Sequence, residues 1–140
     1  MKSTIYLFFK GTCLEAMTHY AKTLGGSIDF VFRNGDAPDP AHRMPGGDDL
    51  VMNMVITIDG ARIMASDTPD AMYAPPRGVR VQLAPTTRAD FDRVFDALGR
   101  DAKAIEMAPA ETFWAERFTM FTDRFGTPWM LNFEGNKTAG

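Results

Sequence analysis

Hydrophobic and polar side chains alternate along residues 111–134, ETFWAERFTMFTDRFGTPWMLNFE, and this pattern predicts the two strands of a hairpin. On the second strand Trp129, Leu131 and Phe133 point to one side, because successive strand side chains face opposite sides of a sheet. Met130 and Asn132 point to the other side. The first set is apolar and the second is half polar. We therefore expect one face of the hairpin to be core and the other to border a small-ligand site.

The rest of the chain predicts two successive copies of a βαβββ unit. The Asp59-Gly60 turn joins two strands of the first copy, and the Asp123–Gly126 turn joins the last two strands of the second. A shift of 66 residues places Gly60 on Gly126 and Met64 on Met130. The predicted strands span residues 4–9, 28–32, 51–58, 61–66, 79–83, 104–107, 117–122 and 127–133.

Each copy also contains one helical stripe. Thr12 with Glu15, and Thr87 with Asp90, have the spacing of a capping box, in which each side chain binds a backbone N–H of the other residue. Apolar residues at helical spacing follow each pair, and we expect each helix to cover one face of its sheet. A shift of 74 residues superposes the two stripes, which are Met17, Tyr20, Ala21 and Leu24 in the first copy and Phe91, Val94, Phe95 and Leu98 in the second.

Two segments rich in proline, glycine and aspartate interrupt this pattern. Residues 33–50 form a long loop, which in a compact domain is often functional or disordered. We predict a single domain over residues 1–140, with module 1 at about 4–66, a linker at 67–78, module 2 at about 79–134 and a tail at 135–140.

Composition restricts the partners. A chain of 140 residues is long enough for a real core, and its net charge of −3 without a basic cluster predicts no nucleic-acid partner. No apolar run approaches the roughly 20 residues needed to cross a bilayer, so no membrane partner is expected. A single cysteine and the absence of a leader pattern predict a cytoplasmic location. The glycine pairs match no nucleotide-binding loop, so nothing supports methyl transfer from a Rossmann-type site.

Three segments resemble one known family: YLFFKGTCLEAMTHYAKTLGG, IDGARIMASD and TFWAERFTMFTDRFGTPWML. The third is similar to the TFWG-x-RFG…D-x-FG-x-xW pattern of the PhnB-like branch of the vicinal oxygen chelate superfamily, with Ala115 and Thr119 in place of two glycines. That superfamily includes glyoxalases, bleomycin-resistance proteins and dioxygenases. The resemblance covers almost the whole chain and implies an α+β fold. Two βαβββ modules with curved mixed sheets would form a cleft, with the helices on the outer faces, and the protein would be a homodimer.

Metal-dependent members of that superfamily use His or Gln on the first strand of each module and Glu on the last. By motif, these places fall on Ile5, Met64, Val79 or Arg80, and Met130. None of these residues is a good ligand for zinc, nickel, iron or manganese. The sequence therefore predicts no metal and no other cofactor.

The predicted function is the binding of a small apolar or aromatic molecule in the cleft, with no catalytic residue assigned. Trp114 either stacks on a flat ligand or packs into the core. The methionines either fill core gaps or make an adaptable pocket floor. The predicted ligand-binding residues are Trp114, Arg117, Met64, Arg62, Met130, Asn132 and Gln82.

Other reactive side chains favour structural interpretations. Cys13 lies near a helix start, where the dipole favours thiolate, but His19 is about 240° further around the helix and cannot act as its base. His42 is expected in solvent. Two other functions stay open. One is a lyase, isomerase or dioxygenase with an atypical site around Glu116, Arg117, Asn132 and Glu134, with or without a metal; the other is a scaffold or regulator that acts through dimer contacts.

Overall fold

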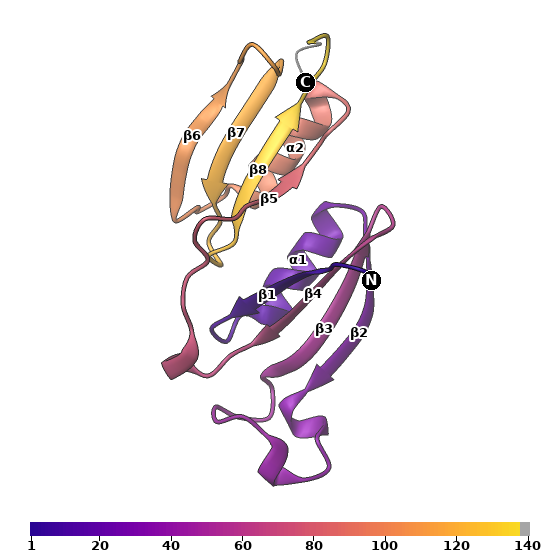
Figure 1. The fold of residues 1–140 in the computed structure, drawn as a ribbon, viewed down its shortest axis with the longest axis vertical. Coiled ribbons are helices and arrows are strands. Elements are labelled where there is room, and N and C mark those ends of the chain that lie inside the picture. Colours follow the sequence, from indigo (N-terminus) through magenta and orange to yellow (C-terminus); the bar gives the residue numbers. More distant parts are fainter. Residues whose placement is uncertain (138–140) are drawn as a thin grey trace. The chain divides into compact units, whose positions relative to one another are not determined.

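The computed structural model describes residues 1–137 and contains two compact units, Met1–Ala74 and Pro75–Gly140. Each unit has one four-stranded mixed sheet and one long helix (Figure 1). The first contains β1 (Ile5–Phe9), α1 (Cys13–Thr23), β2 (Ser27–Arg33), β3 (Val51–Ile58) and β4 (Ala61–Asp67). The second contains β5 (Val81–Leu83), α2 (Arg88–Leu98), β6 (Ala104–Ala110), β7 (Arg117–Thr122) and β8 (Pro128–Phe133).

The two sheets have the same topology. The strand order is β1-β4-β3-β2 in the first and β5-β8-β7-β6 in the second. The first strand of each unit pairs in parallel with the last, and the other pairs are antiparallel. The predicted α+β architecture of repeated βαβββ modules is therefore confirmed. No helix in the described part of the chain is long and apolar enough to cross a membrane.

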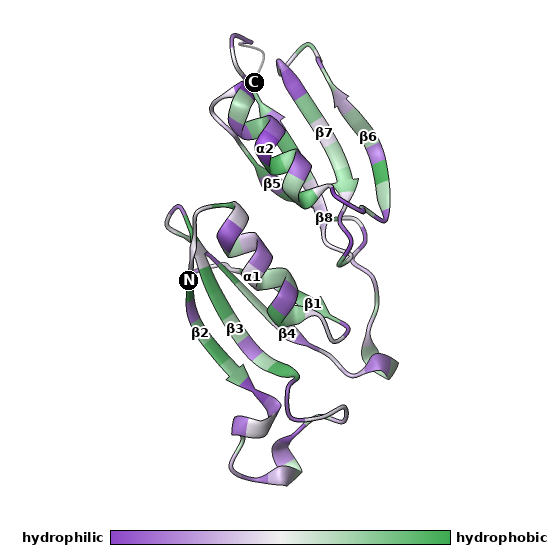
Figure 2. Ribbon diagram, turned by 180° about the vertical axis from the view of Figure 1, so that it is seen from behind, coloured by the Kyte–Doolittle hydropathy of each residue, from purple (hydrophilic) through white to green (hydrophobic). Residues whose placement is uncertain are grey.

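Each helix packs on one face of its own sheet, as Figures 1 and 2 show from opposite sides. In the second unit Trp129, Leu131 and Phe133 are buried, as their alternation predicts. Phe121 meets Phe95 of α2 edge to face, with ring centroids 5.4 Å apart. In the first unit Ile63 and Ala65 are likewise buried, together with Met17 and Tyr20 of α1. The faces turned away from the helices, called here the open faces, carry the remaining side chains.

The two helices begin differently. Thr87 caps α2 as predicted, because its hydroxyl accepts the Asp90 N–H at 3.1 Å. The prediction of a capping box at Thr12 is wrong, because the Thr12 side chain makes no capping hydrogen bond. The carboxylate of Asp67, at the end of β4, instead accepts the Cys13 N–H at 3.0 Å and the Val51 N–H at 2.9 Å. Asp67 thus joins the start of α1 to two strands.

The loop between β2 and β3 has an internal structure that its composition does not predict. It contains two 3₁₀ turns, Asn34–Asp36 and Pro40–His42. The buried Asn34 amide donates to the carbonyls of Met44 and Gly47 and accepts the Met44 N–H, with distances of 2.7–2.9 Å. One polar side chain therefore holds the loop together from within.

The turn between β7 and β8 is fixed by a buried carboxylate. Oδ1 of Asp123 accepts the N–H groups of Phe125 and Thr127, both at 2.9 Å. Oδ2 accepts the indole N–H of Trp129 at 2.8 Å. Asp123 therefore has the structural role in the turn that the sequence predicts, and it also orients a core tryptophan.

Candidate functional site

The open face of the second sheet brings together several of the predicted site residues. Gln82 of β5 pairs with Met130 of β8, and Met130 pairs with Met120 of β7. These three side chains form one row across the sheet, because paired residues point to the same face. Gln82 is exposed and both methionines are half-buried. A polar side chain thus lies in one row with two methionines.

A charged row lies next to the methionine row, toward the β7–β8 turn. Arg80 Nη1 is 3.3 Å from Glu106 Oε1 of β6, and Glu106 accepts the Thr122 hydroxyl at 3.0 Å. On a flat sheet the two edges would be roughly 14 Å apart, three strand spacings. The Arg80 and Glu106 side chains together therefore reach across the open face, over β8 and β7.

A hollow of about 830 Å³ lies over these two rows. Its lining includes Arg80, Gln82, Glu106, Met120 and Met130, together with residues 76–79 of the segment that precedes β5. All of them belong to the second unit. Small-molecule sites usually have volumes of 300–1,000 Å³, and the lining of this hollow combines charged and amide side chains with methionines and prolines.

An aromatic row lies on the other side of the methionines. Asn132 pairs with Phe118, so both face the same side as Met130. The indole N–H of Trp114 donates to Asn132 Oδ1 at 3.1 Å, and its ring meets Phe118 edge to face with centroids 5.3 Å apart. Trp114 is half-buried. It packs on the sheet and remains partly accessible on the open face.

Arg117 does not share this face. It pairs with Phe133, whose side chain lies on the side covered by α2, whereas Asn132 faces away from α2. Glu116 binds the segment that follows β8, because its carboxylate accepts the Asn136 N–H at 3.1 Å. The proposed atypical cluster of Glu116, Arg117, Asn132 and Glu134 therefore does not converge on one point. A change of one position along a strand explains the difference, because it moves a side chain to the opposite face.

The open face of the first sheet has a different character. Tyr6, Phe8 and Phe30 are exposed by 39%, 55% and 48%, and the Phe30 and Phe32 rings are stacked with centroids 6.4 Å apart. Met64 pairs with Tyr6 in the middle of this aromatic surface.

At the end of the first sheet, hydrogen bonds from Thr57 and Ser27 hold the pKa of the Asp29 carboxyl below its usual value. Arg62 contributes a smaller effect of the same sign. The predicted residues Met64 and Arg62 thus belong to the first unit, and Gln82, Met130, Trp114 and Asn132 to the second.

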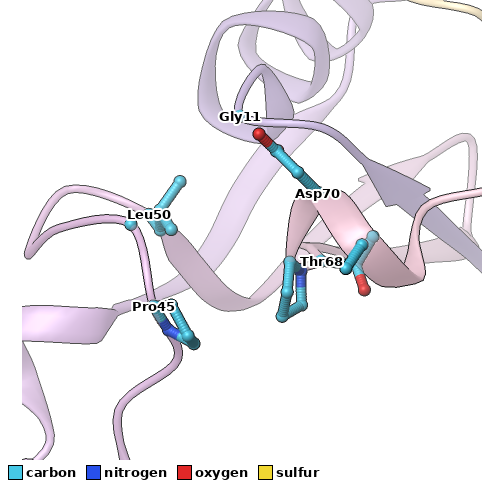
Figure 3. Close-up of a pocket in the computed structure, with 8 residues that line it drawn as sticks. Gly11, Pro45, Leu50, Thr68 and Asp70 are labelled. Carbon is cyan, nitrogen blue, oxygen red and sulfur yellow. The ribbon is translucent and has the colours of Figure 1, made fainter.

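A second, smaller hollow of about 410 Å³ lies in the first unit. Leu50 and Pro45 line one side of it, and Thr68 and Asp70 line the other (Figure 3). Most of its lining comes from the 33–50 loop and the 67–78 segment, and none of the predicted ligand-binding residues borders it. Its lining is mostly apolar, with a single carboxylate, so it offers fewer polar groups than the larger hollow.

Comparison with known proteins shows the family. Residues 6–131 match the family model described as the glyoxalase/bleomycin resistance protein/dioxygenase superfamily. The chain belongs to this superfamily. It is 36% identical over 135 residues to protein YjdN of Escherichia coli, and the match covers 91% of both chains.

Solved structures agree with this assignment. The crystal structure of PA1353 from Pseudomonas aeruginosa has a TM-score of 0.86 at 35% identity, covering 97% of this chain and 99% of that one. A Bacillus cereus PhnB protein, described as a putative 3-demethylubiquinone-9 3-methyltransferase, has a TM-score of 0.79 at 24% identity, with 95% and 99% covered. The second likeness supports the fold, and the resemblance to PhnB-like proteins is confirmed at that level.

The donor chemistry does not fit the metal of the glyoxalase superfamily. Ile5 lies on the helix-covered face, because it pairs with the buried Ile63, so the residue beside Met64 is Tyr6 and not Ile5. The residue beside Met130 is Gln82. Neither the phenol and thioether of the first unit nor the amide and thioether of the second make a good ligand set for zinc or manganese. Within residues 1–137, no three His, Cys, Asp or Glu side chains gather where they could hold a metal ion.

Cys13 is a buried structural residue. Burial raises the pKa of its thiol well above the ordinary value, and the nearby Asp67 carboxylate raises it further. These effects exceed the influence of the helix dipole, because the Cys13 thiol is fully removed from solvent. His42 lies in the exposed 3₁₀ turn at Pro40–His42, with its Nε2 atom 4.0 Å from Asp39.

Several residues that line the larger hollow are not among the predicted ligand-binding residues, including Arg77, Arg80, Glu106 and Met120. Met120 could have been predicted from the sequence, because counting residues outward from the Asp123–Gly126 turn pairs it with Met130. Glu106 could not, since it lies at an irregularity between Ile105 and Met107 where the β6 register shifts. Alternation alone does not assign a face at such a bulge.

Proposed function

We propose that the protein binds a small, mostly apolar or aromatic molecule on the open face of its second sheet, without the metal of the superfamily. The observation that carries this proposal is the row of Gln82, Met120 and Met130 beneath a hollow of about 830 Å³. Methionine side chains are flexible and polarizable, so such a floor adapts to several apolar shapes. Trp114 extends the apolar surface beyond this row, and Asn132 fixes its indole.

Ligand binding by metal-free protein tests the proposal. After treatment with a chelator, the protein is titrated with 2-naphthoate by calorimetry and by thermal shift, since a ligand that binds the folded state raises its apparent stability. The Met130→Lys variant places a charge in the floor of the hollow, and we expect it to abolish binding. Met72→Lys is the matched control, because Met72 is 74% exposed and lies outside the hollow.

Two results would contradict the proposal. Equal affinity of the Met130→Lys variant and the parent protein places the ligand elsewhere. Binding that appears only after a divalent metal is restored shows that the chain uses a metal in spite of its donor set. The parallel variant Met64→Lys reports whether the first unit contributes, as the sequence predicts.

We further propose that the chain forms a homodimer in the cytoplasm. Tyr6, Phe8 and Phe30 leave a large apolar surface exposed on the first sheet, and such surfaces usually mark interaction sites. Two-fold pairing is the commonest arrangement of homo-oligomers. Light scattering at micromolar concentration is expected to give twice 15.5 kDa, and a stable 15.5 kDa species would refute the dimer.

A further inference from the structure

Within the described residues, the guanidinium of Arg80 is anchored through one of its three nitrogen atoms. Nη1 contacts Glu106 Oε1 at 3.3 Å and donates to the carbonyls of Phe121 and Trp129 at 3.2 and 3.3 Å. Its Nε and Nη2 groups donate to no residue of the described chain. The Nε–Nη2 edge of an arginine matches a carboxylate, which it binds through two parallel hydrogen bonds. Arg80 is therefore held in place with this edge still available.

The charge of the hollow is not balanced. Its charged lining residues are Arg77, Arg80 and Glu106, which leaves one net positive charge. Glu106 pairs with Arg80, while Arg77 is exposed and forms no ion pair with any described residue. A ligand with one negative charge would complete this balance.

The three rows of side chains also differ in polarity along the strands. The charged row at Thr122 and the aromatic row at Asn132 are separated by four residues of hairpin on either strand. At about 3.4 Å per residue this separation is roughly 14 Å, with the methionine row midway. The face thus runs from charged through apolar to aromatic.

We infer that the ligand is an elongated monocarboxylate, with its carboxylate on the free edge of Arg80 near Arg77 and its apolar body along Met120 and Met130 toward Trp114. This inference rests on the proposed function and adds the class of ligand to it. A carboxylate is favoured over a phosphonate or phosphate because its single charge and planar shape match the net charge and the available edge.

The test compares three probes of similar shape: 2-naphthoate, neutral 2-naphthamide and doubly charged 2-naphthylphosphonate. We expect the carboxylate to bind at least tenfold more tightly than the amide, the size of effect that hydrogen bonds to a charged group give. The Arg80→Lys variant is expected to lose this advantage, because lysine lacks the two-donor edge. Arg77→Gln should reduce it about threefold to tenfold.

If Arg80→Lys folds poorly, Arg77→Gln still provides a decisive test, because Arg77 is exposed and forms no ion pair with any described residue. Raising the salt concentration should weaken the binding of 2-naphthoate and leave the binding of 2-naphthamide unchanged. Equal binding of carboxylate and amide overturns this inference but leaves the proposed function standing. Tighter binding of the phosphonate overturns the monocarboxylate, and binding of no probe refutes the proposed function itself.

Discussion

The two units share a topology but differ in what holds them together and in what they expose. In the first, Asp67 secures the start of α1 from a distant strand, and the open face is aromatic. In the second, Thr87 caps α2 locally, Asp123 secures a turn, and the open face carries charges and methionines. The strand order therefore sets only where side chains point, and the chemistry of each face is left to individual residues.

The largest expected effect comes from the two buried carboxylates. Asp123→Asn replaces an acceptor of three N–H groups by a side chain that also donates, so one donor faces another. We expect a loss of about 4 kcal/mol in the free energy of unfolding, and about 3 kcal/mol for Asp67→Asn, which serves two N–H groups. Urea unfolding followed by circular dichroism measures both.

Asp96→Asn is the matched control for these two variants. Asp96 is exposed, and surface substitutions usually change stability by less than about 0.5 kcal/mol. A cost below about 1 kcal/mol for Asp67→Asn would show that the long-range anchor of α1 is dispensable. The helix of each unit would then be held by local interactions alone.

Alternation and turn residues were enough to predict the repeated βαβββ order, the α+β class and the helix-facing side chains such as Trp129 and Leu131. They depend on local periodicity, which the sequence displays directly. The cap of α1 was not predictable, because its acceptor Asp67 lies 54 residues away in the chain. The candidate site was likewise predictable only in part. The shared face of Gln82 and Met130 follows from alternation. The position of Glu106 depends on an irregularity in the pairing of β6 with β7, which alternation does not reveal.

Alkaline pH should destabilise the protein through Cys13. The thiol is buried with a raised pKa in the folded protein, whereas an unfolded chain releases its proton near the ordinary value of 9.0. Above that pH the folded state binds the additional proton, so stability falls as pH rises. We expect the stability advantage of the parent over Cys13→Ala to shrink by about 1.4 kcal/mol per pH unit above pH 9. The second unit has no cysteine and no counterpart of this effect.

Unfolding curves of both proteins between pH 7 and pH 10 provide the measurement. The difference between the two is informative because lysines and tyrosines titrate equally in both. A constant difference across this range would mean that the thiol reaches solvent in the folded state.

The smallest effect separates the two helix starts most directly. Thr87→Ala removes the hydroxyl that accepts the Asp90 N–H and should cost about 1 kcal/mol. Thr12→Ala should cost only a few tenths of a kcal/mol, because the Thr12 side chain makes no cap and Asp67 already accepts the Cys13 N–H. The urea midpoints of the two variants, compared with that of the parent protein, measure the two losses. Equal losses would mean that Thr12 caps α1 in solution, and the difference between the two units at their helix starts would disappear.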